Sequence, residues 1–122
     1  VAAGNENLNA CNYSPSRVKQ ALTLGASDVR DNSASFSNTG GCIDLYGPGV
    51  DVESAASGGG STVFSGTSMA SPHGAGTAAL CRERHPGPPA AVAACVVDNS
   101  TPNTLSGVGS DTANKLLYVK EP

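Results

Sequence analysis

Short apolar runs separated by clusters of turn residues dominate the first half of the chain. Residues 21–26, 43–46 and 50–55 combine apolar with small side chains, and Gly, Pro or polar residues follow each run. Runs of this length with such boundaries are typical of strands buried in a sheet. The pattern predicts three short strands there, and residues 1–5 are expected to be the end of a further strand that enters a turn.

The second half of the chain has a different pattern. Residues 67–85 are rich in alanine and end in His85-Pro86-Gly87, which predicts a buried helix with a Pro/Gly stop. A second helix is expected over residues 88–97, and a last short strand over 116–119. Continuous apolar strands combined with helices indicate an α/β sheet that is covered on both faces.

Composition limits the size and the partners of this fold. The chain has 122 residues, 15 of them glycine, and only 4% are aromatic, so its elements pack unusually close or it is part of a larger core. A net charge of −3 with 14% charged residues argues against a nucleic-acid surface and against a basic membrane patch. No apolar run approaches the ~20 residues of a membrane span. We therefore expect neither nucleic acid nor membrane as a partner.

Four cysteines raise the question of the redox compartment. They lack the C-x-x-C spacing of thiolate metal sites, so such a site is not expected. An even number in a short chain favours an oxidised, secreted protein, and reduced, buried cysteines are the alternative.

Candidate chemistry is concentrated at residues 66–73, Gly-Thr-Ser-Met-Ala-Ser-Pro-His. Gly66 permits a tight loop, and Ser68 then falls at the start of the predicted helix. A serine at this place has an unpaired backbone N–H at the positive end of the helix dipole, which suits a nucleophile whose N–H binds the developing oxyanion. On position alone, a simple helix N-cap is the favoured interpretation of Ser68.

These eight residues closely resemble the nucleophile motif of the subtilisin-like serine proteases. Val-Ala-Ala-Gly-Asn at 1–5 resembles the oxyanion-hole strand of the same family, and residues 12–15, 24–26, 35–38 and 45–49 match it further. Together the matches point to the proteinase K-like branch, including its disulfide-containing bacterial members. The resemblance implies that residues 1–122 are the C-terminal portion of one catalytic domain. Its fold would be α/β, with a mostly parallel sheet flanked by helices and a central helix that starts at the nucleophile.

The resemblance also implies roles for individual residues. Ser68 would be the nucleophile, and the Asn5 side-chain amide with the Ser68 N–H would form the oxyanion hole. Ala2, Gly4 and Tyr13 would line one wall of the substrate pocket for the residue before the scissile bond. The substrate would be a protein or peptide, and the enzyme a secreted, extracellular serine endopeptidase.

Two members of the family's catalytic triad have no match in this chain. The Asp-Thr-Gly and His-Gly-Thr-His types of motif are absent, and the only histidines are His73 and His85. His73 is rotated about 140° from Ser68 on one helix, so we expect it to be a buried structural residue, and His85 a solvated one near the helix end. The resemblance therefore implies a complementary N-terminal portion that supplies Asp and His. The chain alone would be inactive, and a non-catalytic fragment or binding module is the alternative function.

The family pattern bears on the cysteines and on one glycine. It implies a disulfide between Cys11 and Cys42, worth about 3–4 kcal/mol in the chain-entropy model. A bridge between Cys81 and Cys95 is left open. Gly74 stands where the family usually has a branched apolar residue, and the glycine would allow closer packing of the helix.

A structural calcium ion is the one cofactor that the resemblance implies. The carboxylate of Asp44, in the apolar run 43–46, would bind Ca²⁺ together with the backbone carbonyls of Lys19 and Ala21. An oxygen-only set of this kind suits Ca²⁺ rather than Zn²⁺. The alternative is that Asp44 caps a turn or accepts backbone N–H groups.

Overall fold

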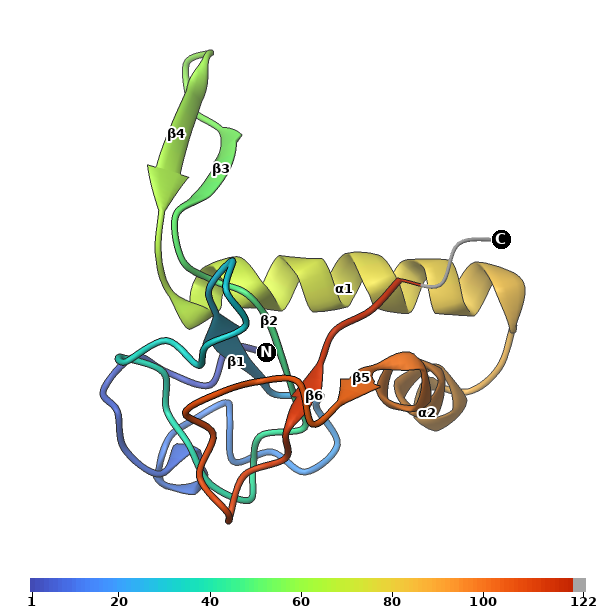
Figure 1. The fold of residues 1–122 in the computed structure, drawn as a ribbon. Coiled ribbons are helices and arrows are strands. Elements are labelled where there is room, and N and C mark those ends of the chain that lie inside the picture. The colour runs from blue at the N-terminus through green and yellow to red at the C-terminus, as the bar shows by residue number, and fades with distance from the viewer. Residues whose placement is uncertain (120–122) are drawn as a thin grey trace.

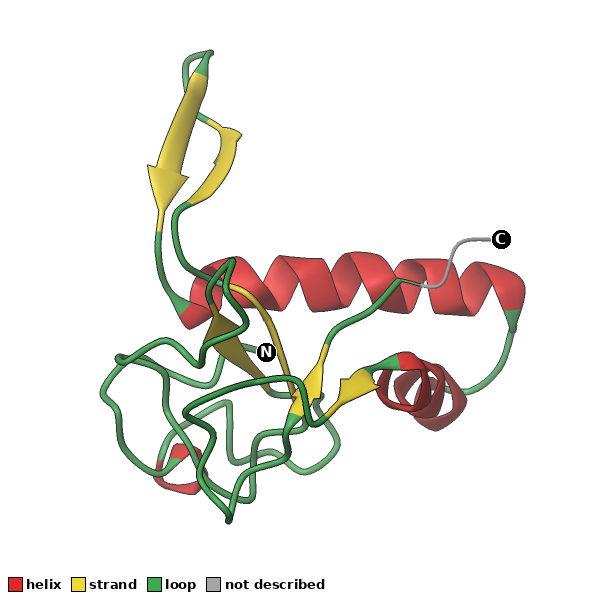
Figure 2. Cartoon of the chain, viewed as in Figure 1, coloured by secondary structure: helices red, strands yellow, loops and turns green. Residues whose placement is uncertain are grey.

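The computed structural model describes residues 1–119, so the last three residues of the predicted domain 1–122 lie outside the described part. The chain forms an α/β structure in which one long helix lies across a small sheet (Figure 1). Loops occupy much of the remainder, as Figure 2 shows for the region near the N-terminus. The predicted α/β fold class is confirmed.

The central sheet contains four strands in the order β1-β2-β6-β5. Strands β1 (Leu24–Ser27), β2 (Leu45–Pro48) and β6 (Lys115–Leu116) are parallel neighbours, whereas β5 (Thr101–Pro102) is antiparallel to β6. The sheet is therefore mostly parallel, as expected. Strand β5 was not predicted, because two residues leave no readable period in the sequence.

Strands β1 and β2 form the buried centre of the sheet. All four residues of β1 and the first three of β2 are buried. Gly25 faces the Tyr46 ring so closely that a Cβ at Gly25 would lie 2.5 Å from a ring carbon. The strands begin two or three residues later than predicted, because the apolar runs include residues that precede the regular backbone pairing.

Helix α1 (Thr67–Arg84) confirms the predicted central helix and has His85 as its C-cap. Its buried residues are small and recur every three or four positions, which places them in one stripe along the helix: Thr67, Ala70, Gly74, Thr77 and Cys81. This stripe packs against β1 and β2. At Gly74 the approach is closest, since a Cβ there would lie 2.7 Å from a Leu24 methyl carbon.

A two-stranded antiparallel hairpin projects from the body of the molecule (Figure 1). Strand β3 (Val52–Ala55) lies within the predicted run 50–55, but it pairs with β4 (Ser61–Phe64) and not with the central sheet. Glycines 58–60, all at positive φ, reverse the chain between the two strands. The sequence pattern did not predict β4, because its residues follow the glycines without an apolar run.

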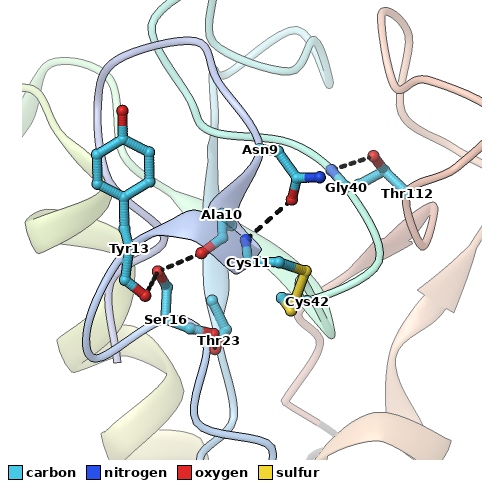
Figure 3. The surroundings of a disulfide bond; sticks show 9 residues. All are labelled: Asn9, Ala10, Cys11, Tyr13, Ser16, Thr23, Gly40, Cys42 and Thr112. Atoms are coloured by element: carbon cyan, nitrogen blue, oxygen red, sulfur yellow. Dashed lines mark hydrogen bonds between the residues drawn. A yellow bond between two sulfur atoms is a disulfide. The ribbon is translucent and has the colours of Figure 1, made fainter.

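Two disulfides connect segments that are distant in sequence. Cys11, in the 3₁₀-helix η1 (Ala10–Asn12), is bonded to Cys42 with Cα atoms 5.3 Å apart, which confirms the expected pairing (Figure 3). Cys81 is bonded to Cys95 across a Cα distance of 6.1 Å. This second bridge, which the sequence left open, joins α1 to α2 (Pro89–Asn99).

Buried side chains form two separate clusters. Leu24, Leu45 and Val96 belong to the cluster beneath the helices, and Tyr46 to the other. Burial raises the pKa of Tyr46, whose buried hydroxyl has no hydrogen-bond partner among the described residues. None of the described helices is long and apolar enough to cross a membrane.

Candidate active site

Ser68 occupies the second position of α1, with its side chain exposed. Gly66, not Ser68, is the N-cap, and no side chain caps the helix. The interpretation of Ser68 as a helix cap is therefore wrong. Within the described chain, neither the Ser68 hydroxyl nor its backbone N–H has a hydrogen-bond partner, so both are free to contact a ligand at the helix N-terminus.

The Asn5 side chain is held in one orientation by Thr67. The Asn5 Oδ1 atom accepts hydrogen bonds from the Thr67 N–H at 2.9 Å and from the Thr67 hydroxyl at 2.8 Å. Because Oδ1 faces two donors, the amide group must present Nδ2 on its other side. Asn5 is exposed, and its N–H₂ group is thus available to a negatively charged atom of a ligand.

The two candidate donors of the oxyanion hole border the same space beside Gly66. A Cβ built on Gly66 would lie 3.6 Å from Asn5 Nδ2 and 3.7 Å from the Ser68 nitrogen. Gly66 has φ 156°, a conformation that favours glycine, and the missing side chain leaves this space open. The structure therefore brings Asn5 and Ser68 together from positions 63 residues apart in the sequence.

Thr67 is a site residue that sequence reasoning missed. Its side chain is fully buried, and its hydroxyl also accepts the Gly4 N–H at 3.1 Å. The hydroxyl thus connects the helix to the loop that carries Asn5. Its place directly before Ser68 was the only signal in the sequence, and that signal says nothing about the direction of the side chain.

Ala2, Gly4 and Tyr13 were predicted to line one wall of the substrate pocket. Ala2 pairs with Leu24 through an isolated parallel bridge, and Gly4 adjoins Asn5 at φ 103°. Tyr13 follows η1, and its half-buried ring points away from the neighbouring disulfide (Figure 3). The groove that contains Ser68 has a volume of about 810 Å³, and its lining does not include Ala2, Gly4 or Tyr13. The role of these three residues therefore stays a prediction.

His73 is exposed, so the prediction of a buried structural histidine is wrong for this chain. Its Nδ1 atom contacts the Met69 carbonyl oxygen at 2.8 Å, one helical turn earlier. The side chain lines the open groove beside Ser68, which nothing in the described chain covers. His85, the other histidine, is exposed at the end of α1, as expected.

The candidate calcium ligands are compatible with an oxygen site. Asp44 is half-buried, and its Oδ2 atom accepts the Thr23 N–H at 2.7 Å, which is a contact that the alternative interpretation of Asp44 predicts. No hydrogen bond found among the described residues uses Asp44 Oδ1 or the carbonyls of Lys19 and Ala21. These three oxygens therefore retain the capacity to bind a hard cation. The described part contains no group of three or more His, Cys, Asp or Glu side chains that could hold a metal, so carbonyls and water would have to complete the site.

Comparison with known proteins defines the family. A profile of the subtilase family matches residues 1–121. An extracellular serine proteinase of Thermus sp. (strain Rt41A) is 46% identical over 97% of this chain, and subtilisin-like protease 5 of Arthroderma otae is 45% identical over 97%. The crystal structure of a cold adapted subtilisin-like serine proteinase superposes with a TM-score of 0.94 at 43% identity, over 99% of this chain. The chain belongs to the subtilase family.

The chain matches only a part of these relatives. It spans 30% of the length of the Thermus and Arthroderma proteins and 44% of the cold adapted proteinase. The activity of a whole subtilase is therefore a proposal for this chain.

Proposed function

We propose that this chain is the nucleophile-bearing C-terminal portion of a secreted serine endopeptidase of the proteinase K-like branch. The observation that carries the proposal is the convergence of Asn5 Nδ2 and the unpaired Ser68 N–H beside Gly66. This arrangement provides two donors next to a serine hydroxyl at a helix N-terminus. Two converging donors of this kind would stabilise the oxyanion of the tetrahedral intermediate of acyl transfer.

The reaction would proceed in two acyl-transfer steps. The Ser68 oxygen attacks the scissile carbonyl of a protein or peptide substrate and loses its proton to a general base. The carbonyl oxygen takes the negative charge and is bound by Asn5 Nδ2 and the Ser68 N–H. The protonated base then gives this proton to the leaving amine as the C–N bond breaks. In the second step the base takes a proton from water, the water oxygen attacks the acyl-enzyme, and the base returns the proton to the Ser68 oxygen as it leaves.

The general base would come from a complementary N-terminal portion of the same protease. His73 Nδ1 contacts the Met69 carbonyl oxygen, and His85 lies at the far end of α1, so among the described residues neither histidine makes a hydrogen bond to Ser68. Without a base the serine remains a poor nucleophile, and this chain alone should be inactive.

Open apolar surface supports such a portion as a partner. A groove of about 640 Å³ lies between α1, α2 and the segment before β1, and its apolar lining includes Leu22, Leu24, Ala78 and Val92. A second portion of the protein that packs against α1 and α2 would cover this groove. The remaining length of the relatives is sufficient to cover it, because this chain spans less than half of each. Secretion is supported by the two disulfides and by the extracellular Thermus relative.

Labelling with a serine-directed phosphonate tests the proposed function. In the full-length protein that contains this chain, peptide mapping should locate the adduct on Ser68, and Ser68→Ala should abolish both labelling and peptide hydrolysis. Ser71→Ala, one turn further along the same helix, is the matched control and should leave labelling unchanged. The isolated chain should not react. A full-length protein that stays unlabelled at Ser68 would favour the non-catalytic alternative.

We also propose that Asp44 and the carbonyls of Lys19 and Ala21 hold a structural calcium ion. A ligand bound only by the folded state adds RT ln(1 + [L]/Kd) to the free energy of unfolding, so EDTA should lower the Tm of the full-length protein. Asp44→Asn should remove most of this calcium dependence, whereas Asp98→Asn, which alters an exposed acid on α2, should preserve it. Equal Tm values with EDTA and with excess calcium would contradict this assignment.

A further inference from the structure

The loop that carries Asn5 is held by one fully buried side chain, Asn38. Its Oδ1 atom accepts the backbone N–H groups of Glu6 and Leu8, each at 3.0 Å. Its Nδ2 atom donates to the Ala3 carbonyl at 3.0 Å and to the Glu6 carboxylate at 2.8 Å. The four contacts use the full capacity of the amide and lie on both sides of Asn5 in the sequence.

The backbone of Asn38 also makes a hydrogen bond to the loop that carries Asn5. Its N–H donates to the Gly4 carbonyl at 2.9 Å. Gly4 has φ 103°, and a Cβ there would lie 2.3 Å from Asn38 Nδ2, so only glycine allows the amide to sit directly against the loop. The exposed fraction of Asn38 is 0%, and its contact with the Ala3 carbonyl is buried, whereas its contacts with Glu6 and Leu8 are partly buried.

The segment around Asn38 is itself fixed to the sheet. The Ser37 hydroxyl accepts the Ala26 N–H of β1 at 3.1 Å, and the Thr39 N–H donates to the Leu8 carbonyl at 2.9 Å. A continuous set of hydrogen bonds therefore runs from β1 through Asn38 to the residues before and after Asn5. Thr67 fixes the side chain of Asn5, whereas Asn38 fixes its backbone.

We propose that Asn38 is a positioning residue of the oxyanion hole. This inference rests on the proposed function and assigns to Asn38 the placement of the Asn5 backbone relative to the Ser68 N–H. A donor that contacts the oxyanion acts only when negative charge develops, so its displacement lowers kcat more than it raises KM. Displacement by about 1 Å can cost up to about 100-fold.

Two variants and a matched control test Asn38 in the full-length protein. Asn38→Asp keeps the shape and the acceptor oxygen but places a carboxylate against the Ala3 carbonyl and the Glu6 carboxylate. Asn38→Ala removes all four side-chain contacts. Asn114→Ala is the control, because Asn114 holds a different loop through the N–H and carbonyl of Leu105 at 3.1 and 2.8 Å.

Both Asn38 variants should lower kcat about 10- to 100-fold with KM within about threefold. The affinity for a peptide aldehyde, which forms an oxyanion on Ser68, should fall in parallel, and that for the matching peptide alcohol should not. Asn114→Ala should lower Tm and leave kcat unchanged. Adding Glu6→Gln to Asn38→Asp should recover part of kcat, because the new amide can donate to the new carboxylate.

The outcomes separate this inference from the proposed function. If the unmodified protein is not labelled at Ser68 by the phosphonate, both are overturned. If Ser68 is labelled but Asn38→Asp keeps its kcat within threefold, or loses no more kcat than Asn114→Ala, the positioning role alone is overturned. If the variants do not fold, hydrogen exchange on the unmodified protein tests the same contacts. The Glu6 and Leu8 amides should be protected from exchange, because both donate to Asn38 Oδ1, and rapid exchange would refute the proposal.

Discussion

Replacement of Thr67 by valine tests how the Asn5 amide is oriented. Valine keeps the shape of the fully buried threonine and removes its hydroxyl. Two hydrogen bonds disappear, one from the Gly4 N–H at 3.1 Å and one to Asn5 Oδ1 at 2.8 Å. The Thr67 backbone N–H still donates to Asn5 Oδ1 at 2.9 Å, so one of the two contacts that orient the amide remains.

The expected magnitudes follow from these contacts. The Gly4 N–H loses its partner, which should lower the free energy of unfolding by about 1–3 kcal/mol. Complete loss of an oxyanion-hole donor costs about 10²–10³ in kcat, a range measured in a subtilisin itself. Because the amide of Asn5 keeps one of its two contacts, we expect a smaller loss, about tenfold in kcat, or about 1.4 kcal/mol in the activation barrier.

Steady-state kinetics and urea denaturation of the full-length protein measure both effects. Thr67→Ser retains the hydroxyl and should keep kcat within about threefold. In an Asn5→Ala background the kcat penalty of Thr67→Val should vanish, since there is no amide left to orient. Equal, additive losses in both backgrounds would refute the argument that Thr67 acts through Asn5.

Three further predictions concern stability, each measured by urea denaturation of the full-length protein. Burial raises the pKa of Tyr46, so the native state keeps a proton that the unfolded chain loses near pH 10. The free energy of unfolding should therefore fall above about pH 10, and Tyr46→Phe should remove this part of the fall; an unchanged pH dependence would contradict it. Replacing Cys81 and Cys95 together by alanine should cost about 3 kcal/mol and leave kcat unchanged, and a loss below about 1 kcal/mol would show that the bridge constrains little. Gly74→Val should destabilise by about 1–3 kcal/mol because its side chain collides with Leu24, and a stabilised variant would show that Leu24 can move aside.

Local sequence features were sufficient for the helices and for the class of fold. The alanine-rich run and its Pro/Gly stop gave α1 within one residue, because helix contacts are made three or four residues apart. The exposure of His73 and the existence of β4 were not predicted. Both depend on what covers a surface or pairs with a strand, which a local pattern does not contain.

The sequence by itself identified Ser68 and Asn5 as the candidate nucleophile and oxyanion-hole amide, because the motifs around them resemble a known family. It did not contain the orientation of the Asn5 side chain, nor the contacts of Asn38 with Ala3 and Glu6. These hydrogen bonds join residues more than 30 positions apart, so a local pattern does not show which side chains meet. Only the packing of α1, the loop after β1 and the N-terminal loop against one another selects which donors meet which acceptors.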